Sequence, residues 1–282
     1  MSETVADPAT GGDTVPARPM APSRPTAPSQ TPAGPASRPA LSERDLLHVN
    51  RDFYDALWAR SRLVPAERFN TWPLVRSLMA PSRTRLEVAP GLRPRLPIAG
   101  TTFVELSEPA VRELRAHGAD AIVGAVSRLP LSDAAFDLVA ALDIVEHVDD
   151  DDGAISELSR VAAPEATLLI SAPLHPSRWT AFDGLVGHRR RYEPDEFVAK
   201  LARHGWHVKS SAVYGMQPRS SRLLDWSVWQ LQNRRERAIW WYDRVILPLA
   251  TRFQGRLELS PGMLDASDVD EVLLVCGKSD TR

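Results

Sequence analysis

The residues best suited to chemistry are a turn of small residues and an acidic side chain, each following a short apolar run. The turn is Glu87-Val88-Ala89-Pro90-Gly91-Leu92, and small residues there let backbone N–H groups approach a ligand closely. Glu105 stands sixteen residues after Ala89, where a carboxylate can accept hydrogen bonds from both hydroxyls of a ribose. This spacing predicts a site for a nucleoside-containing cofactor, although Glu105 could instead cap the helix expected near Pro109.

A second set of residues follows in the middle of the chain. Leu129-Pro130 leads to Phe136-Asp137, and then come Asp143 with Glu146-His147, Glu157 with Arg160-Val161, and an apolar run ending at Pro173. In this order the sequence resembles the class I S-adenosylmethionine-dependent methyltransferases, in particular the subgroup with an LP-x-x-D-x-x-FD block and an EHV block. The resemblance covers about residues 83–210.

The resemblance implies S-adenosylmethionine as the cofactor and assigns its contacts residue by residue. The small-residue turn would surround the methionine part, and Glu105 would hold the ribose. Leu106 and Val126 would flank the adenine ring, and Asp143 would stand beside the methyl group, although it could also cap the next helix. The residues implied to bind the cofactor are Glu87, Ala89, Pro90, Gly91, Glu105, Leu106, Val126 and Asp143.

The sequence departs from the pattern of this family at the turn. Only Gly91 remains of the three glycines in the usual E-x-G-x-G-x-G stretch, and Pro94 and Pro97 leave room for little more than one helical turn afterwards. Ala125 replaces the acid expected to bind the adenine amino group. Each loss removes a contact of about 1 kcal/mol, so we expect weakened cofactor affinity.

Two histidines are candidates for the catalytic base. Methyl transfer is an in-line displacement that requires alignment and exclusion of water, so no metal is expected. An oxygen or nitrogen acceptor must lose its proton, which suits a histidine with an ordinary pKa of about 6.5. His147 would lie next to the methyl group or simply pack against the sheet, and His188 would be a base or an acceptor ligand.

The block Gly187-His188-Arg189-Arg190-Arg191-Tyr192 resembles the Gly-His-x-Arg-Arg-Tyr element of family members that act on glycans, lipid-linked sugars and other metabolites. It implies that Arg190, Arg191 and Tyr192 bind a carboxylate, phosphate or sugar. A solvated arginine loop is the alternative. Three arginines without an RNA-binding module do not predict nucleic-acid binding.

The elements that must position these residues alternate between strand and helix patterns. This βαβ alternation predicts an α/β, Rossmann-like sheet of seven mostly parallel strands with helices on both faces and ligands at the carboxyl ends. The expected strands are 85–88, 102–106, 121–123, 138–142, 167–171, 206–213 and 271–277, and the expected helices are 109–117, 153–161 and 195–204.

The remaining segments predict three further parts. Residues 1–40 are rich in Pro, Ala and Ser and are expected to be disordered. Residues 41–82 predict helices, with Ser42 as a cap and a second helix at 72–79, which would form a lid over the pocket or simply a packing face. The methyltransferase domain at 83–282 carries an insertion at about 218–256, expected as two helices broken near Pro248. It holds four of the eight tryptophans and would be a packed helix pair, an acceptor-binding cap or a membrane-surface helix.

Composition excludes several classes of protein. With 34 basic and 36 acidic residues the formal net charge is −2, which does not attract the whole chain to nucleic acid or an anionic membrane. Cys276 is the single cysteine, so a disulfide framework is excluded. No apolar stretch approaches the roughly 18–20 residues of a membrane span and no leader is recognised, so a cytoplasmic location is expected.

Taken together, these features predict an enzyme that methylates an oxygen or nitrogen of a small or sugar-like acceptor. A catalytically silent relative that binds a partner or regulates it is the alternative, because the glycine turn is eroded. A dinucleotide-dependent dehydrogenase is a third interpretation, which the short spacing from turn to acid disfavours. The sequence gives no prediction of oligomeric state.

Overall fold

The computed structural model describes residues 54–215 and 221–279, without the side chains of residues 221–225. All described residues belong to one compact unit, Leu41–Arg282. The predicted tail at 1–40 and the cap at Ser42 lie outside the described residues.

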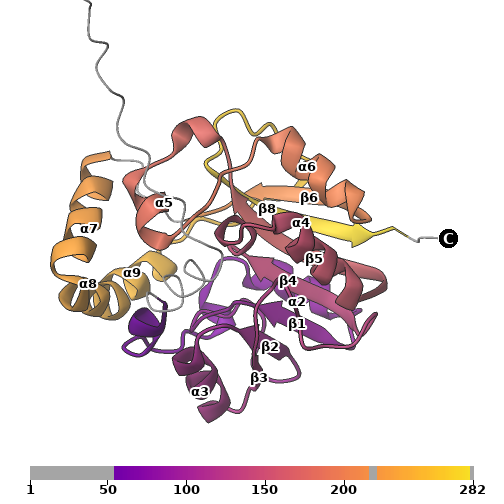
Figure 1. Ribbon diagram of the computed structural model, residues 1–282, viewed down its shortest axis with the longest axis horizontal. Coiled ribbons are helices and arrows are strands. Elements are labelled where there is room, and N and C mark those ends of the chain that lie inside the picture. Colours follow the sequence, from indigo (N-terminus) through magenta and orange to yellow (C-terminus); the bar gives the residue numbers. More distant parts are fainter. Residues whose placement is uncertain (1–53, 216–220, 280–282) are drawn as a thin grey trace, which may run out of the picture. The chain divides into compact units, whose positions relative to one another are not determined.

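The described chain forms one sheet with the strand order β3-β2-β1-β4-β5-β8-β6-β7 (Figure 1). Neighbouring strands from β3 to β5 are parallel, and β8 is antiparallel to both β5 and β6. The strands are β1 (Arg85–Val88), β2 (Thr102–Glu105), β3 (Asp120–Val123), β4 (Phe136–Leu142), β5 (Ala162–Pro173), β6 (Trp206–Val213), β7 (Ser260–Pro261) and β8 (Glu271–Lys278). This confirms the mostly parallel α/β sheet, with β7 as an additional strand that is too short to give a sequence pattern.

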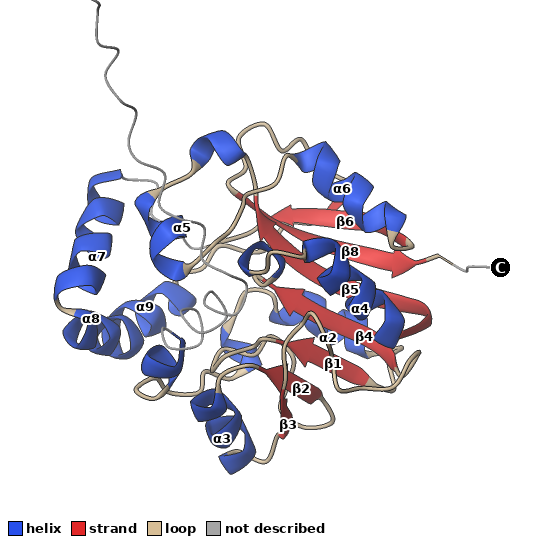
Figure 2. Ribbon diagram, in the orientation of Figure 1, coloured by secondary structure: helices blue, strands red, loops and turns tan. Residues whose placement is uncertain are grey.

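Helices cover both faces of the sheet, as expected, and α4 and α6 lie in front of it in Figure 2. Residues 54–58 are helical and form what we call the lid helix. The further helices are η1 (Ala66–Arg68), α2 (Trp72–Met79), α3 (Glu108–Ala116), η2 (Val145–His147), α4 (Asp151–Val161), η3 (Pro176–Arg178), α5 (Ala181–Val186), α6 (Pro194–Arg203), α7 (Ser221–Asn233), α8 (Arg235–Trp241), the π-helix η4 (Tyr242–Ile246) and α9 (Leu247–Arg252).

The alternation of side chains along β4 explains this layering. Val139 and Ala141 belong to the hydrophobic cluster that includes α4 and α6, whereas Leu138 and Ala140 belong to the cluster that includes α2. Because successive strand residues point to opposite faces, the continuous apolar run of β4 buries both faces. The sheet is thereby fixed between two helical layers, with its strand ends left to build a site.

The insertion corrects one prediction. Its first helix ends near Arg234, whose φ of −142° and ψ of 44° are not helical, and the second continues from α8 through η4 into α9 past Pro248. A proline inside a helix lacks an N–H and clashes with the preceding turn. The π-helical turn Tyr242–Ile246 comes directly before this proline and accommodates it without a break.

Candidate active site

The register of the parallel strands brings the predicted cofactor residues to one edge. Val88 is paired with Val104 and with Ala141, so the turn after β1, the end of β2 and the segment after β4 are neighbours. The Ala89 amide donates to the Val104 carbonyl at 2.7 Å. Ala89 and Asp143 have φ angles of 55° and 51°, which place non-glycine residues in the left-handed region at the edge.

Glu105 is buried at the end of β2, and its carboxylate closes the turn. Oε2 accepts the Gly91 amide at 2.8 Å, and Oε1 accepts the Ser107 amide at 2.8 Å. Burial raises the pKa of Glu105, against the opposing effect of these hydrogen bonds. The Leu106 amide also hydrogen-bonds to this carboxylate, and because each carboxylate oxygen has two lone pairs, the group keeps capacity for a further hydrogen bond.

Glu87 holds a loop that replaces the helix expected after the turn. Residues 91–100 contain no helix, in agreement with the two prolines there. The Glu87 carboxylate accepts the backbone amides of Arg95 and Leu96, each at 2.8 Å. Burial raises the pKa of Glu87 to about 7, although these amides act in the opposite direction. The Glu87 side chain therefore stabilises the loop, a structural role that the sequence did not predict.

The lid helix lies against the turn. Asp55 accepts a hydrogen bond from the Ser107 hydroxyl at 2.6 Å. The Trp58 ring lies over Gly91, where a Cβ would stand 2.8 Å from Cη2 and closer still to Cζ2. Gly91 thus has the positive φ expected of a cofactor turn. Its backbone has no side chain on the face toward the lid helix, and Trp58 covers that face.

Arg93 links the lid to the insertion. Its guanidinium lies 5.2 Å from the Trp58 ring centroid and 4.7 Å from that of Tyr242 in η4. Asp243 accepts the Arg62 amide at 3.1 Å, so η4 also contacts the segment after the lid helix. In Figure 1 the indigo lid segment lies beside α8 and α9. The insertion therefore borders the candidate site through η4.

The insertion's four tryptophans are each about half exposed. Their exposed fractions range from 47% to 56%, at Trp226, Trp229, Trp240 and Trp241. No helix in the described ranges is both long and apolar enough to cross a membrane.

Asp143 stands at the end of β4 beside two groups. Its amide donates to the Ser171 Oγ at 2.9 Å, and that hydroxyl donates back to the carboxylate. Glu271 lies against Asp143, and burial followed by the charge of Asp143 raises the pKa of Glu271. The sequence did not indicate Glu271 as a neighbour of Asp143. Glu271 begins strand β8, and because β8 is antiparallel to β5, its first residue lies at the carboxyl edge of the parallel strands.

The two predicted histidines come together. The rings of His147 and His188 are 4.6 Å apart and meet edge to face. His188 Nδ1 lies 2.9 Å from the Asp183 carboxylate, and Nε2 lies 3.8 Å from Glu146 Oε1. The Tyr54 hydroxyl of the lid helix lies 3.4 Å from His147 Nε2. Tyr54, Asp183 and Glu146 are site residues to which the sequence assigned no role.

Burial shifts the pKa values of His147 and Glu146 in opposite directions. It lowers the pKa of His147 to about 3, with the neighbouring His188 acting in the same direction. It raises the pKa of Glu146 well above its ordinary value, with a further contribution from the charge of Asp143. His147 is therefore neutral at pH 7 and has too little proton affinity for an efficient general base.

The capping of α5 explains the position of His188. Thr180 and Asp183 form a capping box at the start of α5, and Gly187 ends the helix with a φ of 83°. A left-handed residue at this position reverses the chain after the helix. The Asp183 carboxylate is therefore fixed on the helix, and His188 returns to meet it.

The arginines and the tyrosine after His188 have partners within the protein. Arg191 is only 5% exposed and forms two hydrogen bonds with Asp183, at 2.9 and 3.0 Å. The Tyr192 hydroxyl donates to Asp151 at 2.9 Å, and Arg190 forms an ion pair with the same carboxylate at 2.9 Å. These contacts hold the loop that carries His188, so we do not take Arg190, Arg191 and Tyr192 forward as acceptor-binding residues.

The residues expected around the adenine ring follow β2 and β3. Leu106 is half-buried directly after Glu105, whereas Val126 is buried in the main hydrophobic cluster. The Gly124 amide donates to the Glu105 carbonyl at 3.1 Å, which holds the loop after β3 against the end of β2. Pro90 is buried inside the turn.

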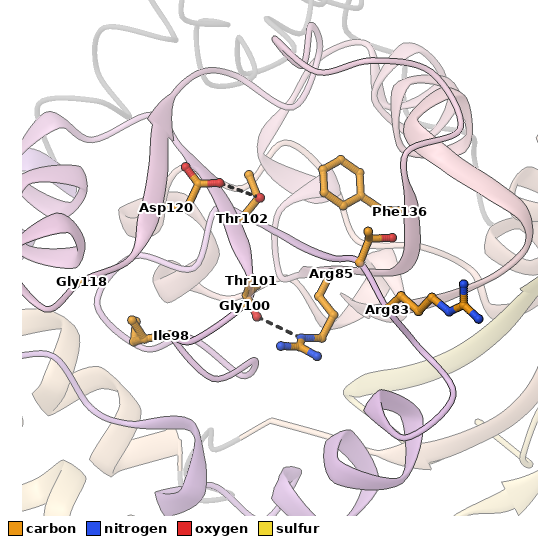
Figure 3. A pocket seen from close by; sticks show the side chains of 10 residues that line it. Arg83, Arg85, Ile98, Gly100, Thr101, Thr102, Gly118, Asp120 and Phe136 are labelled. Carbon is orange, nitrogen blue, oxygen red and sulfur yellow. Dashed lines mark hydrogen bonds between the residues drawn. The ribbon is translucent and has the colours of Figure 1, made fainter.

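A pocket of about 310 Å³ lies at the opposite edge of the sheet (Figure 3). It is lined by residues at the starts of the first four strands, including Arg85, Thr102, Asp120 and Phe136. Arg85 Nε lies 3.4 Å from the Thr101 hydroxyl, and Thr102 donates to Asp120 at 2.8 Å. Ligands of open α/β sheets bind at the carboxyl ends, so this pocket is not the candidate site.

Comparison with known proteins agrees with the fold. Residues 88–170 match a family described as a methyltransferase domain. A Thermotoga maritima structure, described as a SAM-dependent methyltransferase and possible histamine N-methyltransferase, is 15% identical with a TM-score of 0.50, covering 84% of this chain and 94% of that one. A Galdieria sulphuraria structure, provisionally named a sarcosine dimethylglycine methyltransferase, is 13% identical with a TM-score of 0.50, covering 84% and 99%.

The fold is thus the class I, Rossmann-like fold of methyltransferases. More particularly, the chain carries the methyltransferase domain of this class over residues 88–170, and the cofactor that this domain implies is S-adenosylmethionine.

Proposed function

We propose that the protein transfers a methyl group from S-adenosylmethionine to an oxygen or nitrogen atom of a small or sugar-like acceptor. The observation that carries this proposal is the meeting of Gly91, Glu105 and Asp143 at one strand edge, with His147 and His188 beyond it.

The residues at this edge fit an adenosyl group. The Glu105 carboxylate accepts backbone amides of Gly91, Ser107 and Leu106 and still has acceptor capacity for a ribose hydroxyl. Asp143 supplies a carboxylate, held by Ser171, on the side toward the histidines. When bound, S-adenosylmethionine supplies an activated methyl group. Trp58 must move from Gly91 to let a ligand reach the backbone there.

Proton removal is assigned to the cluster of histidines. Asp183 lies at hydrogen-bonding distance from His188 Nδ1, which orients the ring and leaves Nε2 as the atom facing the site. His188 is therefore our candidate base in preference to His147, whose pKa burial lowers to about 3. The lid helix covers this region through Tyr54, whose hydroxyl lies 3.4 Å from His147 Nε2, and such a cover would exclude water as an in-line displacement requires.

Isothermal titration with S-adenosylmethionine and with S-adenosylhomocysteine tests the proposal directly. We expect one cofactor per chain with both compounds. Absence of heat and of a thermal shift with either compound would reject the proposed function. Binding without turnover on a panel of hydroxyl and amine acceptors would instead support a catalytically silent relative.

A further inference from the structure

Glu146, His147 and His188 form a compact set of potential metal ligands on the acceptor side of the site. Each offers one ligand atom, and these atoms all lie within 4.8 Å of one another. Glu146 Oε1 and His188 Nε2 are 3.8 Å apart, which is too long for a hydrogen bond. Ligand atoms around a tetrahedral ion with bonds of about 2.0–2.1 Å are about 3.4 Å apart, so small rotations close this set around an ion.

The carboxylate of Glu146 is the most unusual member of the set. The residue is 0% exposed, and within the described chain neither carboxylate oxygen has a hydrogen-bond partner on another residue. A buried carboxyl group without a hydrogen-bond partner costs free energy even when it is protonated, and a metal ion is one partner that removes this cost. The side chain points toward His188, the direction in which an ion would meet both residues.

His188 is held in the way that metal-binding histidines are held. Asp183 lies 2.9 Å from Nδ1, which fixes the proton on that nitrogen and leaves the lone pair of Nε2 facing Glu146. Asp183 is in turn fixed by two hydrogen bonds from Arg191. A histidine ligand almost always donates its other N–H to a carboxylate or carbonyl, and this partner sets the orientation of the ring.

We propose that Glu146, His147 and His188 bind a divalent transition-metal ion of the Zn²⁺ class. Two imidazoles and one carboxylate suit zinc and its neighbours in the first transition series, whereas Mg²⁺ and Ca²⁺ prefer oxygen ligands. Three protein ligands leave an open position on a tetrahedral ion. This site would be an addition to the methyltransferase edge, to which the sequence assigned no metal.

The catalytic consequence rests on the proposed function. An acceptor hydroxyl in the open position would lose its proton more readily, because a bound divalent ion stabilises the oxyanion. His188 would then serve as a ligand, and the proton would leave to solvent instead of to its Nε2 atom.

Zinc titration of the untagged full-length chain, stripped with EDTA and studied without cofactor, tests the site. We expect one Zn²⁺ per chain by isothermal titration, with binding weakened at least about tenfold by E146Q, H147A and H188A. The matched controls are E113Q and H117A, which alter an exposed pair of the same residue types on α3, 3.7 Å apart. They should leave the stoichiometry and the dissociation constant unchanged.

The proposal is overturned if the stripped chain binds no Zn²⁺, or if the three site variants bind it as the original chain does. Circular dichroism identifies any variant that fails to fold, and E146Q is nearly isosteric. As a measurement without variants, Co²⁺ should give visible d–d bands that Zn²⁺ removes, and absence of these bands also overturns the proposal. A chain that binds zinc but neither S-adenosylmethionine nor S-adenosylhomocysteine would refute the proposed function alone.

Discussion

The indole of Trp58 lies directly over Gly91, at the point where a side chain on Gly91 would collide with the ring. This contact joins the lid helix to the turn whose backbone would approach the cofactor. If the cofactor binds at Gly91 as we propose, the ring and the ligand cannot occupy the same space, so we expect cofactor binding to displace Trp58 and to open the lid helix.

We expect this displacement to be visible in tryptophan fluorescence. Stopped-flow mixing with S-adenosylhomocysteine should change the emission of the original chain, and W58F should bind the ligand but lose most of the change. W229F, which alters a half-exposed tryptophan of α7, serves as the control and should keep the signal. An equal fluorescence change in W58F and the original chain would contradict an opening lid.

A substitution at Glu105 tests the ribose contact. Glu105→Ala leaves the amides of Gly91 and Ser107 without their acceptor and would disturb the turn itself, so Glu105→Gln is the better variant. It retains one oxygen acceptor and loses the charge. We expect cofactor affinity to fall by about 1–3 kcal/mol, roughly 5- to 150-fold, because charge-assisted hydrogen bonds are the stronger ones.

Isothermal titration measures this loss, and the melting temperature shows whether the turn is intact. Glu67→Gln, at an exposed position in η1, is the control. A dissociation constant that is unchanged in Glu105→Gln would remove Glu105 from the cofactor site.

Ala89 has a backbone conformation that glycine adopts without strain. Its φ is 55°, where a residue with a Cβ is strained by about 1–2 kcal/mol. Ala89→Gly relieves this strain but increases the freedom of the unfolded chain, so we expect a net gain of about 0.5–1 kcal/mol in unfolding free energy. Urea unfolding checks the sign. Ala116→Gly in α3 is the contrasting variant and should cost up to about 1 kcal/mol.

The strands could be predicted because β1, β2 and β6 are bounded by clear breaks in hydrophobic pattern. The meeting of Glu105 with Asp143 followed from the same topology, since both residues come after parallel strands. Pro248 was misread because sequence pattern does not show that a π-helical turn can accommodate a proline. Local pattern therefore gave the frame of the fold more reliably than its irregular helices.

Much of the histidine cluster could not be predicted from spacing. Asp183 and His188 are near in sequence, but Glu146 and Tyr54 reach them only through tertiary packing. The sequence pattern around Arg191 predicted an exposed acceptor-binding residue, yet Arg191 is buried and hydrogen-bonded to Asp183. A sequence indicates which side chains are charged, whereas burial and partners decide whether the charge is used for binding or for structure.

Glu87 predicts a pH dependence of stability near neutrality. Burial raises its pKa from 4.5 to about 7 in the folded chain, so the folded state holds this proton more tightly than the unfolded state. The stabilisation is fully present below pH 4.5 and is lost as the pH rises through 7. At about 1.4 kcal/mol per pH unit, the total loss is about 3 kcal/mol.

Urea unfolding of the original chain and of Glu87→Gln, measured between about pH 5 and pH 8, isolates this effect. The variant cannot ionise at residue 87, so the original chain should lose most of that 3 kcal/mol relative to it across the range. Glu67→Gln, at an exposed position, should remain parallel to the original chain. If the curve of Glu87→Gln were also parallel to that of the original chain, Glu87 would ionise at the same pH in the folded and unfolded chains. Burial would then not raise the pKa of this carboxyl against the effect of the Arg95 and Leu96 amides.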